Sequence, residues 1–292
     1  MREKYRIVEN DWVAHGIFET VVSAPQIAEK ARPGQFLNVY IPDGPMLLPR
    51  PFSVSDVRGS NISIIYKVKG GGTALLSELA EGCEVEALGP LGTGFFDYPG
   101  SLTDLGRDHF ADRKVTVFLI GGGLGIPPLL YAARAIKAAR HGRAQIVAFL
   151  GYPGDPWYTK QLLNHVDKVF SASDMPGRAD ISGTVIDAMD AKARGYLGDR
   201  ETANAPALIC GPEAMMSAAA QWCAGHGLKS RVSLEARLGC GYGVCRGCSR
   251  VFKSPEGGEG PYMDYSGTKR TVKKVCVHGP VFWGDEIIWK KP

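Results

Sequence analysis

Four cysteines in the last quarter of the sequence have the spacing of metal ligands. Cys240, Cys245 and Cys248 follow the pattern C-x4-C-x2-C, and Cys276 comes after 27 further residues. This arrangement is typical of plant-type [2Fe-2S] clusters, whereas structural zinc sites more often take a pair of cysteines from each side. Glycines let such a loop wrap closely and aim backbone N–H groups at sulfur, and the loop holds Gly239, Gly241, Gly243 and Gly247. The sequence therefore predicts one [2Fe-2S] cluster, with a structural zinc ion as the alternative.

A second group of residues has the chemistry to hold a flavin nucleotide. Arg50-Pro51-Phe52-Ser53 is followed by Gly70-Gly71-Gly72-Thr73, a glycine turn that enters a predicted helix. Unpaired N–H groups at such a turn form an anion site, and Arg50 could add a bidentate contact to a pyrophosphate. Phe52 could lie against a flat ring, and Ser53 could offer its hydroxyl to a ring nitrogen. The alternative is a proline turn and a helix cap that bind nothing.

A third group lies where apolar strands run into helices. The segment Gly121-Gly122-Gly123-Leu124-Gly125-Ile126-Pro127-Pro128 follows one strand, and Cys210-Gly211-Pro212 follows another. The ends of parallel strands in an α/β sheet are where dinucleotides bind. The two prolines depart from the usual G-x-G-x-x-G pattern, so a standard Rossmann dehydrogenase is not indicated. We interpret the two strand ends as a nicotinamide pocket, with Cys210 as a plain core cysteine in the alternative interpretation.

Composition excludes several classes of protein. The chain has 292 residues, 45% hydrophobic and 22% charged, which is ordinary for globular domains. A net charge of +4 is too small to indicate nucleic-acid binding. The longest uncharged stretch, residues 115–133, is interrupted by glycines and prolines, so we expect no membrane helix. The absence of an apolar leader and the clustering of cysteines favour metal chemistry in a reducing cytoplasm.

The pattern of apolar residues predicts a multidomain α/β plus β chain. Residues 1–97 alternate in short runs typical of an antiparallel flavin-binding β-barrel, with strands near 16–22, 35–41 and 61–68 and a helix over 73–80. Residues 98–113 are predicted to be a linker or insertion. Residues 114–237 predict a doubly wound α/β nucleotide domain, with strands at 115–120, 145–150, 168–171 and 207–210 and helices at 127–141, 160–166 and 213–226. Residues 238–292 predict a small iron–sulfur domain without regular structure.

The order of these motifs resembles the ferredoxin–NAD(P)+ reductase-like family. With the cysteine segment, the chain is similar to the electron-transfer subunits of class 1B dihydroorotate dehydrogenases. The likeness covers nearly the whole chain, in stretches 50–53, 72–73, 89–95, 121–129, 210–216, 233–237 and 275–282. It implies FAD in the barrel, NAD(H) exchanging hydride with flavin N5, and the cluster carrying single electrons. The cofactor contacts that we predict are Arg50, Pro51, Phe52, Ser53, Lys67, Val68, Gly72, Thr73, Gly121, Gly122, Gly123, Gly125, Cys210, Gly211 and Pro212, and no catalytic acid or base is assigned.

The resemblance also implies a partner. In the dihydroorotate system this is an FMN-containing catalytic subunit that oxidises dihydroorotate to orotate, in a heterotetramer. One alternative is a diaphorase subunit of an NAD(P)H–ferredoxin or sulfur-linked complex; related subunits carry aspartate at the first ligand, so Cys240 favours the dihydroorotate system. Another is a non-catalytic iron–sulfur or zinc scaffold. Three stretches depart from the family: 97–113, 172–206 and the basic 249–275. The loop 151–155 offers no Arg or Lys for a 2′-phosphate, which favours NADH.

Overall fold

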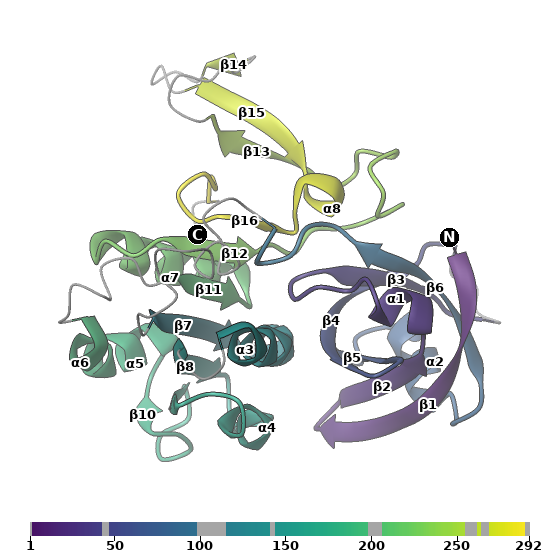
Figure 1. The fold of residues 1–292 in the computed structure, drawn as a ribbon, viewed down its shortest axis with the longest axis horizontal. Helices are drawn as coiled ribbons and strands as arrows, with labels where there is room; N and C mark the ends of the chain where they lie inside the picture. The colour runs from purple at the N-terminus through teal and green to yellow at the C-terminus, as the bar shows by residue number, and fades with distance from the viewer. Residues whose placement is uncertain are drawn as a thin grey trace.

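A computed structural model describes residues 2–42, 47–97, 115–140, 144–197, 206–254, 262–263 and 269–289. The predicted linker at 98–113 lies outside these residues. Figure 1 shows a β-barrel beside a layered α/β unit, with a small sheet projecting from the side where the two meet. No helix in the part of the chain described is long and apolar enough to cross a membrane.

The N-terminal unit is a closed barrel with strand order β1-β2-β5-β4-β3-β6. Apolar residues at alternate positions fill its interior, as in β6, where Val85 and Ala87 are buried. The strands are β1 (Arg2–Ala14), β2 (Ile17–Ser23), β3 (Phe36–Tyr40), β4 (Arg50–Arg58), β5 (Asn61–Lys67) and β6 (Glu84–Leu91), and two short helices, α1 (Pro25–Ala28) and α2 (Gly71–Glu78), accompany them. The predicted barrel is confirmed, and the predicted helix begins two residues earlier, at the glycine turn.

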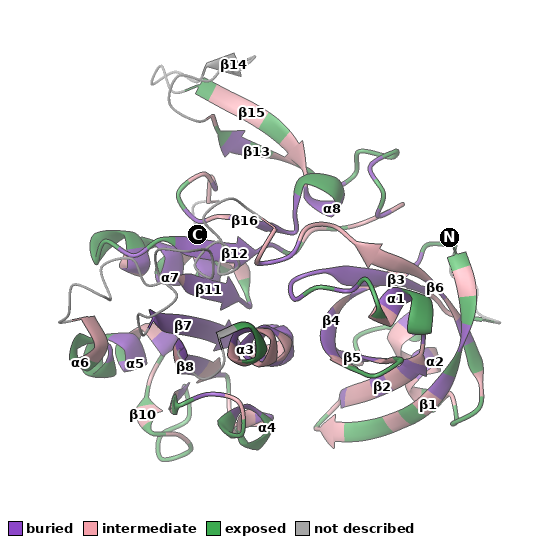
Figure 2. Cartoon of the chain, in the orientation of Figure 1, coloured by how far each residue is buried: buried purple, intermediate pink, exposed green. Residues whose placement is uncertain are grey.

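The second unit is a seven-stranded sheet with order β10-β9-β8-β7-β11-β12-β16. All neighbours are parallel except β12 and β16. Every residue of the central strand β7 is buried, and Figure 2 shows buried strands with exposed helix faces outside them. The strands are β7 (Val115–Gly122), β8 (Ala144–Tyr152), β9 (Lys168–Ser173), β10 (Ile181–Ser182), β11 (Ala207–Cys210), β12 (Ser230–Ser233) and β16 (Val281–Trp283). The predicted doubly wound α/β fold is confirmed.

Helices cover both faces of this sheet. A short 3-10 turn, η2 (Gly123–Gly125), leads from β7 into α3 (Ile126–Arg140), which packs together with barrel residues Ile17 and Ile65 in one core cluster. The other face carries α5 (Val185–Lys192) and α7 (Glu213–Gly225). The remaining short helices are α4 (Thr159–Leu163) and α6 (Arg194–Leu197).

Buried polar contacts join the barrel to the sheet unit. Asp56 of β4 is completely buried and forms ion pairs with Arg134 of α3 and with Arg58. The Tyr131 hydroxyl of α3 donates to the carbonyl oxygen of Ala31 at 2.7 Å. Because these contacts lie beside the shared apolar core, they fix one side of the space between the two units.

The cysteine segment contains regular structure that the sequence did not reveal. After the loop 239–248, a three-stranded antiparallel sheet has the order β13-β15-β14. Phe252 of this sheet is fully buried and lies 4.5 Å from the Phe282 ring of β16, measured between centroids. The prediction of an irregular segment is therefore wrong for these residues. The elements are β13 (Ser249–Lys253), β14 (Tyr262–Met263), β15 (Lys269–Lys274) and α8 (Val275–His278).

Candidate functional site

The four cysteines come together as two pairs. The backbone N–H groups of Cys240 and Cys245 each donate to the other residue's sulfur at 3.4 Å. The sulfurs of Cys248 and Cys276 lie 3.2 Å apart, although 28 positions separate the two residues in sequence. Among the residues described, no three His, Cys, Asp or Glu side chains are arranged around a single ion. Two pairs suit a centre with two metal ions better than one four-coordinate zinc ion.

The surroundings of the two pairs differ. Desolvation opposes ionisation of Cys240, but backbone N–H groups of the same loop outweigh it and lower the pKa of this thiol to about 6. Burial, followed by the contact with Cys248, raises the pKa of Cys276 to about 12. A positive metal centre removes the proton from a coordinating thiol. The donor set and the loop N–H groups therefore fit a cluster, and Cys240, Cys245, Cys248 and Cys276 are the residues that would hold it.

Two glycines allow the loop to take this shape. Gly241 and Gly243 have φ angles of +78° and +90°, which side-chain-bearing residues rarely adopt. A Cβ atom on Gly243 would lie 2.6 Å from the Val277 side chain, next to the ligand Cys276. The loop can therefore approach the Cys276 segment only with glycine at this position.

A cavity of about 300 Å³ lies where the barrel, the parallel sheet and the cysteine segment meet. Its walls include the predicted flavin residues Pro51, Phe52, Ser53, Lys67 and Thr73 and the predicted nicotinamide residues Gly125 and Cys210. Sequence reasoning did not assign several other wall residues: Phe36, Ile65, Tyr66, Lys69, Leu124, Pro128, Ser233, Leu234, Glu235, Ala236, Leu238, Val275 and Pro280. Residues 233–237 carry part of the family resemblance but no predicted cofactor contact. Their place in the cavity wall follows from the fold.

The barrel side of the cavity suits a flat ring. The Phe52 and Tyr66 rings lie 5.2 Å apart and are tilted by 41°. Burial raises the pKa of Tyr66 to about 12, so its hydroxyl stays protonated. Thr73 accepts hydrogen bonds from the N–H groups of Lys69 and Gly70, at 2.9 and 3.2 Å. Thr73 thus caps the helix and also lines the cavity, and its contact with a flavin stays a prediction.

Three predicted flavin residues do not line the cavity. Arg50 lies half-buried at the start of β4, and its guanidinium donates to the Leu48 carbonyl oxygen at 2.8 Å. Val68 and Gly72 also stand outside the lining. All three lie close in sequence to lining residues, so their contact with the nucleotide part of a flavin stays a prediction.

The two predicted strand ends meet. Cys210 of β11 pairs in register with Gly121 of β7, and a Cβ atom on Gly125 would overlap the backbone of Cys210. A Cβ atom on Gly211 would lie 3.0 Å from the backbone of Gly122. The predicted residues that are not in the cavity wall itself are Gly121, Gly122, Gly123, Gly211 and Pro212. Their binding of a dinucleotide remains a prediction, although the close approach explains the glycines.

Cys210 presents a neutral thiol to this cavity. Burial is the main reason that its pKa rises to about 12, and the nearby Glu235 carboxylate adds to the effect. A thiol held protonated is a poor nucleophile. Cys210 is therefore both a core cysteine and a cavity residue, without a covalent role.

The reason for expecting NADH needs a correction. The loop 151–155 itself has no Arg or Lys, as noted from the sequence. However, the Arg178 guanidinium reaches this loop from the turn after β9 and lies 3.1 Å from the Asp155 carboxylate. A cation is thus present at this strand end, although Asp155 already pairs with it.

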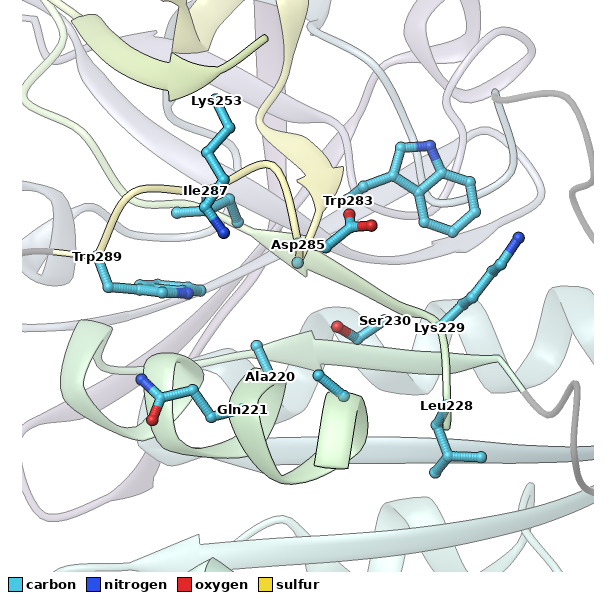
Figure 3. Close-up of a pocket in the computed structure, with 12 residues that line it drawn as sticks. Ala220, Gln221, Leu228, Lys229, Ser230, Lys253, Trp283, Asp285, Ile287 and Trp289 are labelled. Carbon is cyan, nitrogen blue, oxygen red and sulfur yellow. The ribbon is translucent and has the colours of Figure 1, made fainter. Parts of the chain in front are cut away.

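A second cavity, of about 330 Å³, lies between α7, β12 and the segment after β16 (Figure 3). Trp289, Ile287 and Ala220 give it a largely apolar wall, with Lys253 and Asp285 at its edge. None of the predicted site residues lines it. The first cavity, where three units meet, is therefore the candidate cofactor site.

A barrel and a doubly wound sheet that share one cavity define an oxidoreductase of the ferredoxin reductase-like class. Residues 235–288 match the iron–sulfur cluster binding domain of dihydroorotate dehydrogenase B. The electron transfer subunit of dihydroorotate dehydrogenase B (NAD(+)) from Streptococcus pneumoniae is 32% identical over 284 residues, with 96% of each chain covered. The subunit of the same name from Caldanaerobacter subterraneus is 28% identical, with 98% of each chain covered. The chain belongs to this family of electron transfer subunits.

Solved structures agree with this assignment. The structure of an NADH-dependent reduced ferredoxin-NADP oxidoreductase superposes with a TM-score of 0.72 and 27% identity, covering 98% of this chain and 90% of that one. The cytochrome b5 reductase domain of Ulva prolifera nitrate reductase has a TM-score of 0.55 at 16% identity, over 74% and 89% of the two chains. The second likeness shows the fold alone. The predicted family, fold class, electron-transfer role, cofactors and partner subunit are confirmed, whereas the assignment of single residues to cofactors stays a prediction.

Proposed function

We propose that this chain carries electrons between NAD(H) and the catalytic subunit of a dihydroorotate dehydrogenase B, through FAD and a [2Fe-2S] cluster. One observation carries the proposal: the cavity between barrel and sheet is walled by Phe52, by Cys210 and by Val275, the neighbour of Cys276. Residues predicted for the flavin and nicotinamide sites and the neighbour of a predicted cluster ligand therefore line one cavity, which supports the proposal. When bound, FAD takes up the electron pair of a hydride and passes the electrons on singly, as a [2Fe-2S] cluster requires.

The chain's own residues then have defined roles. Phe52 and Tyr66 supply the aromatic wall against which a flat ring would lie. Gly123, directly after β7, has open space beside its Cα atom, which leaves room for a dinucleotide to approach the backbone closely. Cys210 and Ser233 add uncharged side chains to the far wall beside the Glu235 carboxylate, because the thiol stays protonated.

We assign the partner contact to the surface around the cysteine loop. Tyr242, Val244 and Val277 are exposed by 54%, 74% and 40%, and all three lie within two residues of a predicted cluster ligand. Exposed apolar side chains that gather at one place mark an interaction surface. A partner that covers these residues would receive electrons close to the cluster. This surface is the one that we propose for the catalytic subunit.

We also place the protein in the cytoplasm. None of the seven cysteines, all of which the structure describes, forms a disulfide, and disulfides are rare in the reducing cytoplasm.

Reconstitution with a catalytic subunit of this enzyme class tests the proposal. The two chains together should form orotate from dihydroorotate with NAD+, whereas this chain alone should only pass electrons from NADH to dyes. Val244→Glu should slow the coupled reaction and leave dye reduction unchanged. Leu163→Glu is the matched control, because Leu163 is 53% exposed on α4, away from the cluster (Figure 1). Orotate formation by the single chain would contradict the division of labour.

A further inference from the structure

Asn38 connects the flavin barrel to the cluster loop. It lies on β3, is completely buried, and donates from its side-chain nitrogen to the carbonyl oxygen of Cys240 at 2.8 Å. The two residues are 202 positions apart in sequence. On β3 its register partner is Pro51, which lines the cavity. One side chain therefore stands between the flavin motif and the first predicted cluster ligand.

The loop rests directly on this amide. Gly241 follows Cys240 with a φ of +78°, and a Cβ atom there would overlap the Asn38 side chain. The other half of the cysteine site is attached differently, since the N–H group of Thr93 donates to the Gly279 carbonyl oxygen. The barrel thus holds the Cys240 loop through a side chain and the Cys276 segment through its backbone.

Stability alone does not account for an asparagine at position 38. Its side-chain oxygen is buried and has no hydrogen-bond partner among the residues described. A buried amide with an unused acceptor is unfavourable, and a leucine of similar size would avoid it. The bond to Cys240 is what distinguishes asparagine from leucine here.

We infer that Asn38 is a positioning residue, which fixes the Cys240 loop on the barrel and sets the electrostatic environment of the cluster. This inference rests on the proposed function, because it takes the four cysteines as cluster ligands. The amide N–H withdraws negative charge from the Cys240 carbonyl oxygen. Without it, that oxygen makes the addition of an electron nearby less favourable.

The test is an EPR-monitored redox titration of the full chain with its cofactors. Asn38→Leu should make the cluster about five- to tenfold harder to reduce, which is a shift of roughly 40–60 mV to more negative potential for one electron. Asn38→Asp should shift the potential in the same direction, since a carboxylate offers no proton to the carbonyl. Asn10→Leu is the matched control: Asn10 also lies in the barrel and donates to Leu76 and Leu79, but it does not contact the loop.

A second measurement covers variants that do not retain the cluster. Hydrogen exchange of amides 239–247 should be about tenfold faster in Asn38→Leu than in Asn10→Leu. An unchanged potential in Asn38→Leu, or equal exchange and equal cofactor loss in both leucine variants, would overturn the inference. Absence of iron from the wild-type chain would instead refute the proposed function itself.

Discussion

The cofactor cavity and the cysteine loop are held in different ways. Cavity residues stand on strands whose register is fixed by neighbours, as in the pairs Pro51–Asn38 and Cys210–Gly121. The loop 239–248 contains no helix or strand. It is held by N–H groups aimed at sulfur, by the amide of Asn38, and by single hydrogen bonds from Lys274 and Val275 to its carbonyl oxygens. The cavity is therefore a property of the folded sheets, whereas the loop depends on local contacts and on its metal centre.

The two sites should therefore respond differently to substitution. A change at the loop should affect the cluster and spare the flavin. A change at the interface of barrel and sheet should affect the stability of the whole chain.

The largest effect is expected from Cys276→Ser. Loss of one of four thiolates should abolish the cluster's visible bands and its iron, while FAD stays bound, because Cys276 is not in the cavity wall. Absorption and iron analysis measure both. Cys83→Ser, in the barrel, is the control and should keep both cofactors. Loss of FAD from the Cys276 variant would show that the two sites are not separable.

Arg134→Met should destabilise the interface of the two large units. Asp56 is fully buried, so removing Arg134 leaves only Arg58 to balance its carboxylate. We expect the free energy of unfolding to fall by about 2–3 kcal/mol, somewhat less than for a pair with a single partner. Chemical denaturation measures it. Lys137 lies on the same helix as Arg134 and pairs at the surface with Asp167. Lys137→Met should therefore lower the free energy of unfolding by less than about 1 kcal/mol. Equal losses in both variants would contradict a special role for the buried pair.

Arg50→Ala should weaken FAD binding if Arg50 contacts the pyrophosphate. The loss of one charge-assisted hydrogen bond is worth about 1.5–3 kcal/mol, or roughly 10- to 150-fold in affinity. Fluorescence titration of the flavin-free chain measures the dissociation constant. Arg6→Ala, an exposed arginine on β1, is the control. Unaltered affinity would mean that Arg50 only orders the chain near Leu48, and release of FMN on heating would contradict the identity of the flavin.

Asp155→Ser should change nucleotide preference. Arg178 would lose its carboxylate partner and become available to a 2′-phosphate. We expect the ratio of kcat/KM for NADPH over NADH in dye reduction to rise by about tenfold, and to return to the wild-type value in Asp155→Ser/Arg178→Ala. No change in the single variant would place the adenine ribose elsewhere.

The smallest effect is expected for the pH dependence of Cys210. Burial raises its pKa from 9.0 to about 12, so the neutral thiol is favoured in the folded state. Its contribution to stability is complete below pH 9 and is lost as the pH rises toward 12. Dye reduction between about pH 6 and pH 8.5 should therefore show no thiol titration, and Cys210→Ser should leave the pH profile unchanged. A thiol pKa near 7 in that profile would refute this assignment.

The sequence predicted the two sites to different extents, for physical reasons. Three cluster ligands lie within nine residues, so their spacing alone indicates the chemistry. Tyr66, Glu235 and Val275 enter the cavity only because three units meet, and no local pattern shows that.

Long-range contacts also explain the errors. Arg178 reaches the Asp155 loop from a separate turn. The strands β13 and β15 have no alternating apolar pattern, because Phe252 is their one buried side chain and the valines Val251 and Val272 are exposed. No local pattern indicates the role of Asn38, since its partner Cys240 lies 202 positions away.

In the proposed function, electrons from NADH reach the cysteine site through the cavity. The most direct measurement is an anaerobic NADH titration of the purified chain, in which flavin absorption and the EPR signal of the cluster are both recorded. We expect both to change in the wild type and only the flavin to change in Cys276→Ser. The opposite result would be a reduced flavin beside an intact wild-type cluster that stays oxidised at a potential at which the cluster can accept electrons. That result would contradict electron transfer through the cavity.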